Sequence, residues 1–461
     1  MPQRGREPEL ELQEQVNRVA ARERVLLLLA MLFVLVNAVA YGLVAADGAC
    51  LGNCVRQVAV HLVAPGLWAV ALALAHGVLS RHHPKRDPLL LPILGLLSGW
   101  GLVLVDRLAP GFLVRQTVWV LLGIGVAVLL ALWPRPKPGD PGGMRWLRRY
   151  RYTWLTAGLA LLALTFVLGV NPSGTGLRLW LGVRLPWVGG VYFQPSELLK
   201  LLAIIFFASY MEDKHGLVEV PLVKLGPFRV ARPPVAYLAP LLLTWGLSLL
   251  LLFWQRDLGA AMLFFLVFLV MLYLASGRWE SLASGLTLLA VLGLIAYLVP
   301  LDALSVVRSR FDNWLDPWPA ASSSGFQTVQ SLLALSAGGI LGQGVGQGFP
   351  TYIPVVHSDF SFAAVAEEWG LIGTLSVIMC LAVWMQRALR LALTASRPFL
   401  SFLAAGIAAL VAVQSLIIMG GVTRLFPLTG VTLPFLSYGG SSMAVSCMMM
   451  GLLLKLSGEA Y

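Results

Sequence analysis

Long apolar stretches separated by short polar segments recur along the whole chain. Each contains at least about 17 mostly apolar residues, which is enough for a helix to cross about 30 Å of hydrocarbon. The pattern predicts an all-α polytopic membrane protein with about 12 transmembrane helices. We expect the spans at residues 25–45, 58–79, 89–105, 112–133, 153–170, 195–211, 234–254, 258–275, 281–300, 361–385, 399–420 and 434–455.

Composition supports the same class. Of the 461 residues, 58% are hydrophobic and only 12% are charged, whereas about a quarter of the residues in a soluble domain are charged. The chain therefore lacks the polar side chains needed to cover a water-facing globule.

The formal net charge of +11 sorts by the predicted side of the membrane. With both termini assigned to the cytoplasm, the cytoplasmic segments carry 23 basic and 12 acidic residues, so they hold the entire surplus. This is the positive-inside bias that orients membrane helices. Basic clusters such as 145–151 suit anionic membrane lipids, and the distribution argues against nucleic acid as a partner.

Residues 1–24 are polar for too long to form a signal-peptide n-region, so we expect a cytoplasmic N-terminal segment followed by a retained helix at 25–45. Cys380 and Cys447 lie within spans and are expected to pack. Cys50 and Cys54 share an exoplasmic loop, where a disulfide and two free thiols are equally compatible with the sequence.

One connection is much longer than the rest. Residues 301–360 form an exoplasmic loop of about sixty residues, and loops longer than about 15 residues are usually functional or disordered. Its aromatic residues and a predicted helix at 326–335 favour order. A glycine series at 338–348 permits tight turns and close approach of the backbone to a ligand. It could serve as a lid tether or could cradle a phosphate, although no P-loop context accompanies it.

Acidic residues stand where this loop enters the next span. Asp359 is a candidate general base, because a carboxylate at the mouth of an apolar bundle is costly unless it is hydrated, paired or used. The residues allow a helix-cap role equally well. Glu367 and Glu368 lie about two turns further along and are harder to explain as caps.

Other ionisable residues map to the same face. Glu197 and Lys200 are three residues apart on one helical face, as an intramembrane ion pair that either binds substrate or fixes helix packing. Asp257, in a tight exoplasmic turn, either faces a substrate cavity or caps the following helix. Exoplasmic arginines run against the positive-inside bias and suit phosphate or carboxylate binding; they are Arg115, Arg178, Arg184, Arg308, Arg310 and Arg424.

The chain has no zinc-type Cys/His cluster and no Gly-x-Ser-x-Gly elbow. Carboxylates and arginines at one face of an apolar bundle instead favour an anionic lipid-linked substrate. A carboxylate would take a proton from a sugar hydroxyl while arginines hold a pyrophosphate.

Several of these segments resemble, in order, the motifs of the SEDS family of cell-wall glycan polymerases, which includes RodA, FtsW and SpoVE. The resemblance covers roughly residues 89–456. The matching pieces are Phe193–Lys200, Gln255–Gly259, Leu315–Trp318, Gly325–Gln327 with Gln330–Ser331, Gly338–Gly339, His357–Phe360, Glu367–Gly373 and Gly430–Ser441.

The resemblance implies a ten-helix core at 89–456 and two extra N-terminal helices within 25–80. By position, Asp359 matches the essential exoplasmic aspartate of the family, and Glu197 and Lys200 match its intramembrane pair. Asp257 and Arg115 also match functional positions.

The implied reaction polymerises lipid II: the acceptor GlcNAc 4-hydroxyl attacks C1 of the donor MurNAc and releases undecaprenyl pyrophosphate. Exoplasmic arginines, with Arg308 and Arg310 among them, would stabilise the leaving group, together with a divalent cation (Mg or Mn). The implied partner is a class B penicillin-binding protein, and the implied location is the bacterial inner membrane.

Three positions depart from the family pattern. Arg256 replaces the usual proline before Asp257, Tyr192 replaces a basic residue, and Val355-Val356 stand where a glutamate often precedes the His-Ser-Asp motif. A lipid II flippase and a non-catalytic scaffold remain as alternatives, and the sequence supports elongation and division roles alike. The motif-bearing exoplasmic loop favours the enzyme.

Overall fold

The computed structural model describes residues 6–46, 54–133, 144–171, 178–185, 189–214, 222–225, 228–231, 235–299 and 305–459. Most of them are helical, and the predicted all-α polytopic class is confirmed. The long helices are α1 (Arg6–Ala45), α2 (Cys54–His82), α3 (Leu90–Leu108), α4 (Leu113–Ala131), α6 (Arg151–Leu168), α7 (Pro195–Lys214), α8 (Val235–Trp254), α9 (Leu258–Ser276), α10 (Trp279–Leu298), α13 (Ser361–Thr394), α14 (Pro398–Val422) and α15 (Gly440–Glu459).

The remaining elements are short. They are the helices α5 (Arg145–Arg149), α11 (Ser305–Leu315) and α12 (Phe326–Gly338), the single turns η1 (Pro110–Phe112), η3 (Trp318–Ala320) and η4 (Pro350–Tyr352), and two antiparallel hairpins, β1 (Leu181–Leu185) with β2 (Gly189–Phe193) and β3 (Leu222–Leu225) with β4 (Phe228–Ala231). The apolar pattern did not predict the hairpins, which lie between the spans.

Ten helices in the described ranges are long and apolar enough to cross a membrane. Helices α7 and α8 occupy the other two predicted spans. Helix α7 contains several charged residues, and the apolar part described for α8 is short, Leu241–Trp254. The count of about 12 transmembrane helices therefore stays a prediction. The last span was predicted to begin too early. Helix α15 starts at Gly440, because Phe435 adopts a left-handed φ of 64°, which a right-handed helix does not allow.

The chain divides into two compact units. Unit 1 comprises residues 1–138, 313–387 and 415–461, and unit 2 comprises residues 139–312 and 388–414.

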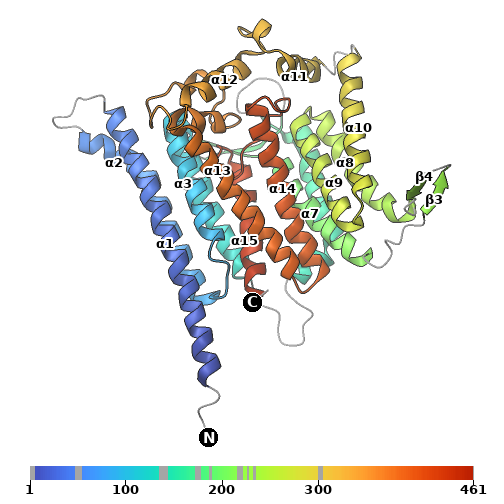
Figure 1. Ribbon diagram of the computed structural model, residues 1–461, viewed down its shortest axis with the longest axis horizontal. Coiled ribbons are helices and arrows are strands. Elements are labelled where there is room, and N and C mark those ends of the chain that lie inside the picture. The colour runs from blue at the N-terminus through green and yellow to red at the C-terminus, as the bar shows by residue number, and fades with distance from the viewer. Residues whose placement is uncertain are drawn as a thin grey trace. The chain divides into compact units, whose positions relative to one another are not determined.

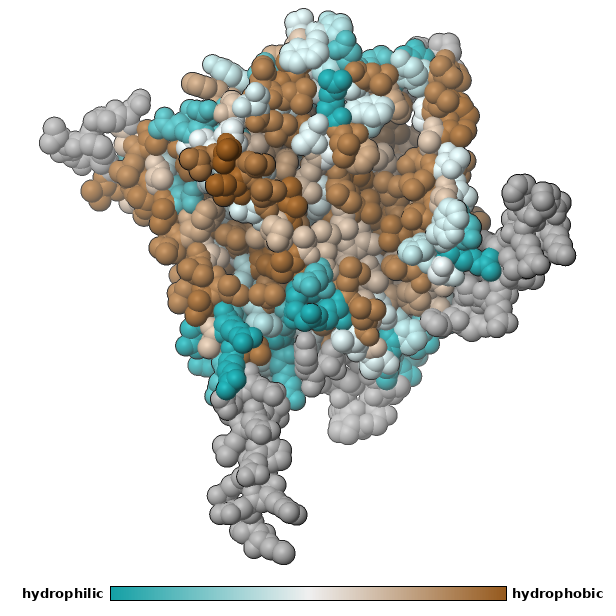
Figure 2. Space-filling view, viewed as in Figure 1, coloured by the Kyte–Doolittle hydropathy of each residue, from teal (hydrophilic) through white to brown (hydrophobic). Residues whose placement is uncertain are grey.

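In unit 1, small residues let the helices approach closely. A Cβ on Gly99 would meet the Trp68 ring, and one on Gly123 would meet the Cys447 sulfur. Helix α12 lies across one end of α3 and α13, whereas the start of α1 and the end of α15 lie at the opposite end (Figure 1). The outer face of α1 is apolar, as the brown surface at the left of Figure 2 shows, and its exposed residues include Leu28, Leu32 and Val36.

In unit 2, α7 packs between α6 and the part of α14 that belongs to this unit, residues 398–414. Gly158 of α6 meets Leu199 of α7, and Gly406 of α14 meets Ile204 of α7. This packing buries Lys200, whose side chain is only 4% exposed.

Cys50 and the side chain of Cys54 lie outside the described residues, so their predicted alternatives stay untested. Cys380 and Cys447 are free thiols, the first half-buried and the second buried, as expected for packing residues.

Candidate functional site

Asp359 lies in unit 1, two residues before α13 begins. Its amide donates to the carbonyl oxygen of Val355 at 3.3 Å, and its carboxylate accepts the Ser358 hydroxyl. Its side chain is half-buried. A donated hydrogen bond favours the ionised carboxylate, which is the form a general base needs.

An aromatic cluster supports the residue two positions earlier. The His357 ring lies 5.1 Å from the Phe112 ring and 5.4 Å from the Tyr438 ring. Burial lowers the pKa of His357, so the imidazole is neutral near pH 7. The guanidinium carbon of Arg115 stands 4.7 Å from the centroid of Phe112, so the cluster links Arg115 to the segment that carries Asp359.

The segment Leu433–Gly440 packs against the same place. The Tyr438 amide donates to the His357 carbonyl at 2.8 Å, and the Ser437 hydroxyl lies 2.6 Å from that of Ser361. Buried Gln116 joins α4 to this segment, since it donates to the Ser437 carbonyl and accepts the Gly439 amide. Three motifs that are distant in sequence therefore meet around Asp359.

The glycine series forms a wrap that we name the clasp, residues 338–349. It surrounds a break in α13 at Gly370, where φ is 65° and ψ is −159°. The amides of Gln343 and Gly344 donate to the carbonyl oxygens of Glu367 and Glu368 at 2.8 and 3.0 Å. These backbone groups are thus engaged with the protein, so the clasp differs from both a loose tether and a phosphate cradle.

Both glutamates also contribute side chains to the clasp. Glu367 accepts the Phe349 amide at 2.7 Å and so closes the loop that contains Asp359. Glu368 pairs with Arg107 at 3.1 Å, and Arg107 also donates to the Gly348 carbonyl at 2.9 Å. Sequence reasoning missed Arg107, although a charged residue at the end of an apolar span is a detectable signal.

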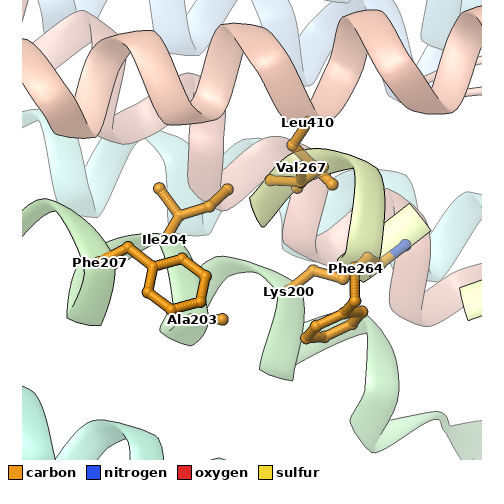
Figure 3. Close-up of a pocket in the computed structure, with 7 residues that line it drawn as sticks. All are labelled: Lys200, Ala203, Ile204, Phe207, Phe264, Val267 and Leu410. Carbon is orange, nitrogen blue, oxygen red and sulfur yellow. The ribbon is translucent and has the colours of Figure 1, made fainter. Parts of the chain in front are cut away.

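The intramembrane pair lies in unit 2. Lys200 Nζ is 2.7 Å from Glu197 and 3.2 Å from the side-chain oxygen of Gln414. Gln414, a polar residue within a predicted span, was also missed. The cavity beside Lys200 has a volume of about 10 Å³, too small for a sugar, and the lysine amine points away from Phe207 (Figure 3). The described geometry thus resembles a structural pair.

Asp257 has the predicted cap geometry. Its carboxylate accepts the Ala260 backbone amide at 3.1 Å and the Gln194 side-chain amide at 3.3 Å. Burial raises the pKa of Asp257; the Ala260 hydrogen bond opposes this effect, the charge of Glu197 adds to it, and those of Lys200 and Arg310 oppose it.

Arg256 precedes this cap at a φ of 56°. A proline ring holds φ near −65°, so the proline usual in the family cannot adopt this turn. Arginine at this position therefore permits a turn that proline would not.

Other arginines bind backbone carbonyls. Arg308 donates to the carbonyls of Tyr297 and Val299 at the end of α10, and Arg424 donates to those of Trp314 and Leu315. Arg178 is exposed, whereas the side chain of Arg184 lies outside the described residues.

Within the described ranges, no group of three or more His, Cys, Asp or Glu residues is placed to hold a metal ion. The divalent cation that the family resemblance implies therefore stays a prediction.

The chain is similar to several known proteins. The chain is 37% identical over 397 residues to a peptidoglycan glycosyltransferase RodA of Mycobacterium bovis, covering 84% of this chain and 81% of the relative. It is 37% identical over 350 residues to a probable peptidoglycan glycosyltransferase FtsW of Geobacter sulfurreducens, covering 75% and 85%.

Two solved structures are also similar. One describes the coordination of polymerization and crosslinking by a peptidoglycan synthase complex, with a TM-score of 0.63, 28% identity and coverage of 82% of this chain and 98% of that chain. The other is the rod shape determining protein RodA of Thermus thermophilus, with a TM-score of 0.56, 25% identity and the same coverage. The model of the cell cycle protein family of FtsW, RodA and SpoVE matches residues 90–461. The resemblance seen in the sequence is thereby confirmed, and the chain belongs to this family.

Proposed function

We propose that the chain is a peptidoglycan glycosyltransferase that polymerises lipid II at the exoplasmic membrane face, for elongation or division. A relative named RodA and a relative named FtsW each cover more than two thirds of this chain. The observation that carries the proposal is the convergence of His357–Ser361, Leu433–Gly440 and the start of α4 around Asp359.

In this reaction Asp359 takes the proton of the acceptor GlcNAc 4-hydroxyl as that oxygen attacks C1 of the donor MurNAc. The bond from C1 to the pyrophosphate breaks, and undecaprenyl pyrophosphate leaves. Arg115, whose guanidinium lies over the Phe112 ring, is suited to bind the pyrophosphate. Arg310 contributes positive charge near Asp257.

On this proposal Glu197, Lys200 and Asp257 stabilise the packing of unit 2. They affect substrate indirectly, by positioning the helices that carry them. Among the proposed substrate-binding arginines, Arg308 is the least suited to bind substrate, because two of its N–H groups already donate to backbone carbonyls.

The proposed location is the bacterial inner membrane, with residues 1–24 and the C-terminus cytoplasmic, extra helices in 25–80 and the core at 89–456. The start of α1 and the end of α15 lie at the same end of unit 1, which supports this topology (Figure 1). Contact with membrane lipids is supported by an apolar groove of about 590 Å³ between α1, α3 and α13, whose lining includes Leu29, Ile93 and Met379.

The proposed partner is a class B penicillin-binding protein that crosslinks the glycan. The solved complex with a TM-score of 0.63 couples polymerization to crosslinking, which supports a transpeptidase partner here.

The test is glycan polymerisation from purified lipid II in detergent, with the partner present and class A transglycosylases inhibited. We expect glycan chains from the wild-type protein. Lipid II scrambling in vesicles without polymerisation would favour the flippase, and absence of both activities would favour the scaffold.

A further inference from the structure

The N-terminal helices α1 and α2 precede the family match, which begins at residue 90. We propose that they are a positioning element for the clasp and, through it, for the loop that carries Asp359. This inference rests on the proposed function for its catalytic consequence only. Three separate contacts carry it.

The first contact joins α1 to the break in α13. The Trp369 indole donates to the side-chain oxygen of Asn37 at 2.9 Å, directly before Gly370. Asn37 in turn donates to the Phe33 carbonyl at 2.7 Å, so both ends of its amide are engaged. The Trp100 ring packs between Phe33 and Trp369, at 5.0 and 5.3 Å.

The second contact places α1 directly on the clasp. Gly346 adopts a φ of 77°, and a Cβ there would lie 3.2 Å from both Tyr41 and Val44. Helix α1 therefore forms the wall against which this turn of the clasp is shaped.

The third contact runs through α2. His61 Nδ1 lies 2.7 Å from an Asp106 carboxylate oxygen, and the His61 ring stands 4.9 Å from Tyr41. The next residue, Arg107, binds Glu368 and the Gly348 carbonyl of the clasp. His61 thus holds the end of α3 from which Arg107 reaches the clasp.

A helix pair that merely anchors the chain needs only apolar side chains. Here α1 and α2 instead place Asn37, Tyr41 and His61 within the apolar spans, where polar groups are costly unless they are used. Tyr41 meets Gly346 of the clasp itself. Asn37 and His61 contact Trp369 and Asp106, the chain neighbours of Glu368 and Arg107, which are bonded to the clasp. This arrangement identifies α1 and α2 as part of the frame that fixes the Asp359 loop.

The test compares Asn37→Leu and Trp369→Phe, which each remove one side of the same hydrogen bond, with Val36→Ala as control. Val36 neighbours Asn37 but is 56% exposed on the outer face. The full-length proteins are studied in detergent. Amide hydrogen exchange of residues 340–352 reports on the clasp, and steady-state polymerisation of lipid II with the partner gives kcat and KM.

We expect roughly fivefold faster exchange in 340–352 for both variants, with exchange in α12 unchanged, because one buried hydrogen bond is lost. We expect kcat to fall by a similar factor with KM unchanged, and the double variant to resemble the single ones. Val36→Ala should match wild type in both measurements.

Unchanged exchange in 340–352 for both variants would overturn the inference, as would unchanged kcat in proteins that polymerise. If the variants exchange faster in 340–352 but the wild-type protein makes no glycan, the proposed function is refuted and the structural role of α1 stands.

Discussion

The hydroxyl oxygens of Ser361 and Ser437 lie 2.6 Å apart, although 76 residues separate them in sequence. Ser361 begins α13 directly after the segment that carries Asp359, and Ser437 also accepts the Leu433 amide at 2.9 Å. This buried pair fixes the Asp359 segment to the loop before α15.

Replacing Ser437 with alanine removes both bonds and leaves the Leu433 amide without this acceptor. We expect a loss of about 1–2 kcal/mol in folding free energy, because buried donors are costly to leave unpaired. Thermal unfolding in detergent measures it. Ser376→Ala, at an exposed hydroxyl bonded within its own helix, is the control and should be near neutral; equal melting temperatures for the two variants would contradict the assignment.

Gly370 is expected to tolerate no side chain. Its φ of 65° with ψ of −159° is a region that L residues avoid, and a Cβ would stand 2.4 Å from the Gly342 nitrogen. Gly370→Ala should cost at least about 1–3 kcal/mol. Gly125→Ala, in open space within α4, should unfold at or above the wild-type temperature; parity between the two variants would show that the clasp does not constrain the break.

Ten of the spans could be predicted from sequence in the described residues, because a membrane helix needs only a long apolar run. Asp359 could be singled out as a candidate, because a carboxylate at the mouth of a span stands out. The break at Gly370 could not be predicted, since a single glycine within a helical run is tolerated and does not by itself mark a break. The structure of the clasp could not be predicted either. The glycine series indicated positive φ angles, but tertiary packing decides that Glu367 and Glu368 are its hydrogen-bond partners.

The structure adds contacts that the sequence could not supply for two of the ambiguous residues. Asp257 had two interpretations in the sequence, and its carboxylate accepts the Ala260 amide as a helix cap does. For Lys200, the sequence indicated the Glu197 partner through helical spacing but gave no sign of Gln414, which lies 214 residues away.

The Glu197–Lys200 pair supports a charge-removal prediction. Lys200→Met leaves Glu197 without its cation in an apolar setting, and we expect a loss of about 3 kcal/mol in stability. The double variant Glu197→Gln/Lys200→Met should be more stable than Lys200→Met alone, because it contains no unpaired charge. Melting temperatures in detergent decide this, and a double variant less stable than the single would contradict the pairing.

His357 predicts a pH dependence of stability. Burial lowers its pKa, so as pH falls through about 6.5 the unfolded chain takes up a proton that the folded chain does not. Stability therefore decreases from about pH 6.5 downward, towards the lowered pKa. His357→Phe keeps an aromatic ring beside Phe112 and should flatten the melting-temperature profile between pH 7 and 5. His82→Phe, at an exposed histidine, should retain the wild-type slope; the same slope in all three proteins would contradict the burial argument.

The most direct test of the account is the polymerisation rate of Asp359→Asn, measured from lipid II with the partner present and compared with Asp312→Asn, an exposed carboxylate bonded to the Tyr297 hydroxyl. Size-exclusion profiles and melting temperatures establish that both variants are folded. The account predicts that Asp359→Asn loses at least about 100-fold in kcat, the lower range for a general base, while Asp312→Asn keeps near wild-type activity. A folded Asp359→Asn protein that polymerises lipid II at the wild-type rate would contradict it.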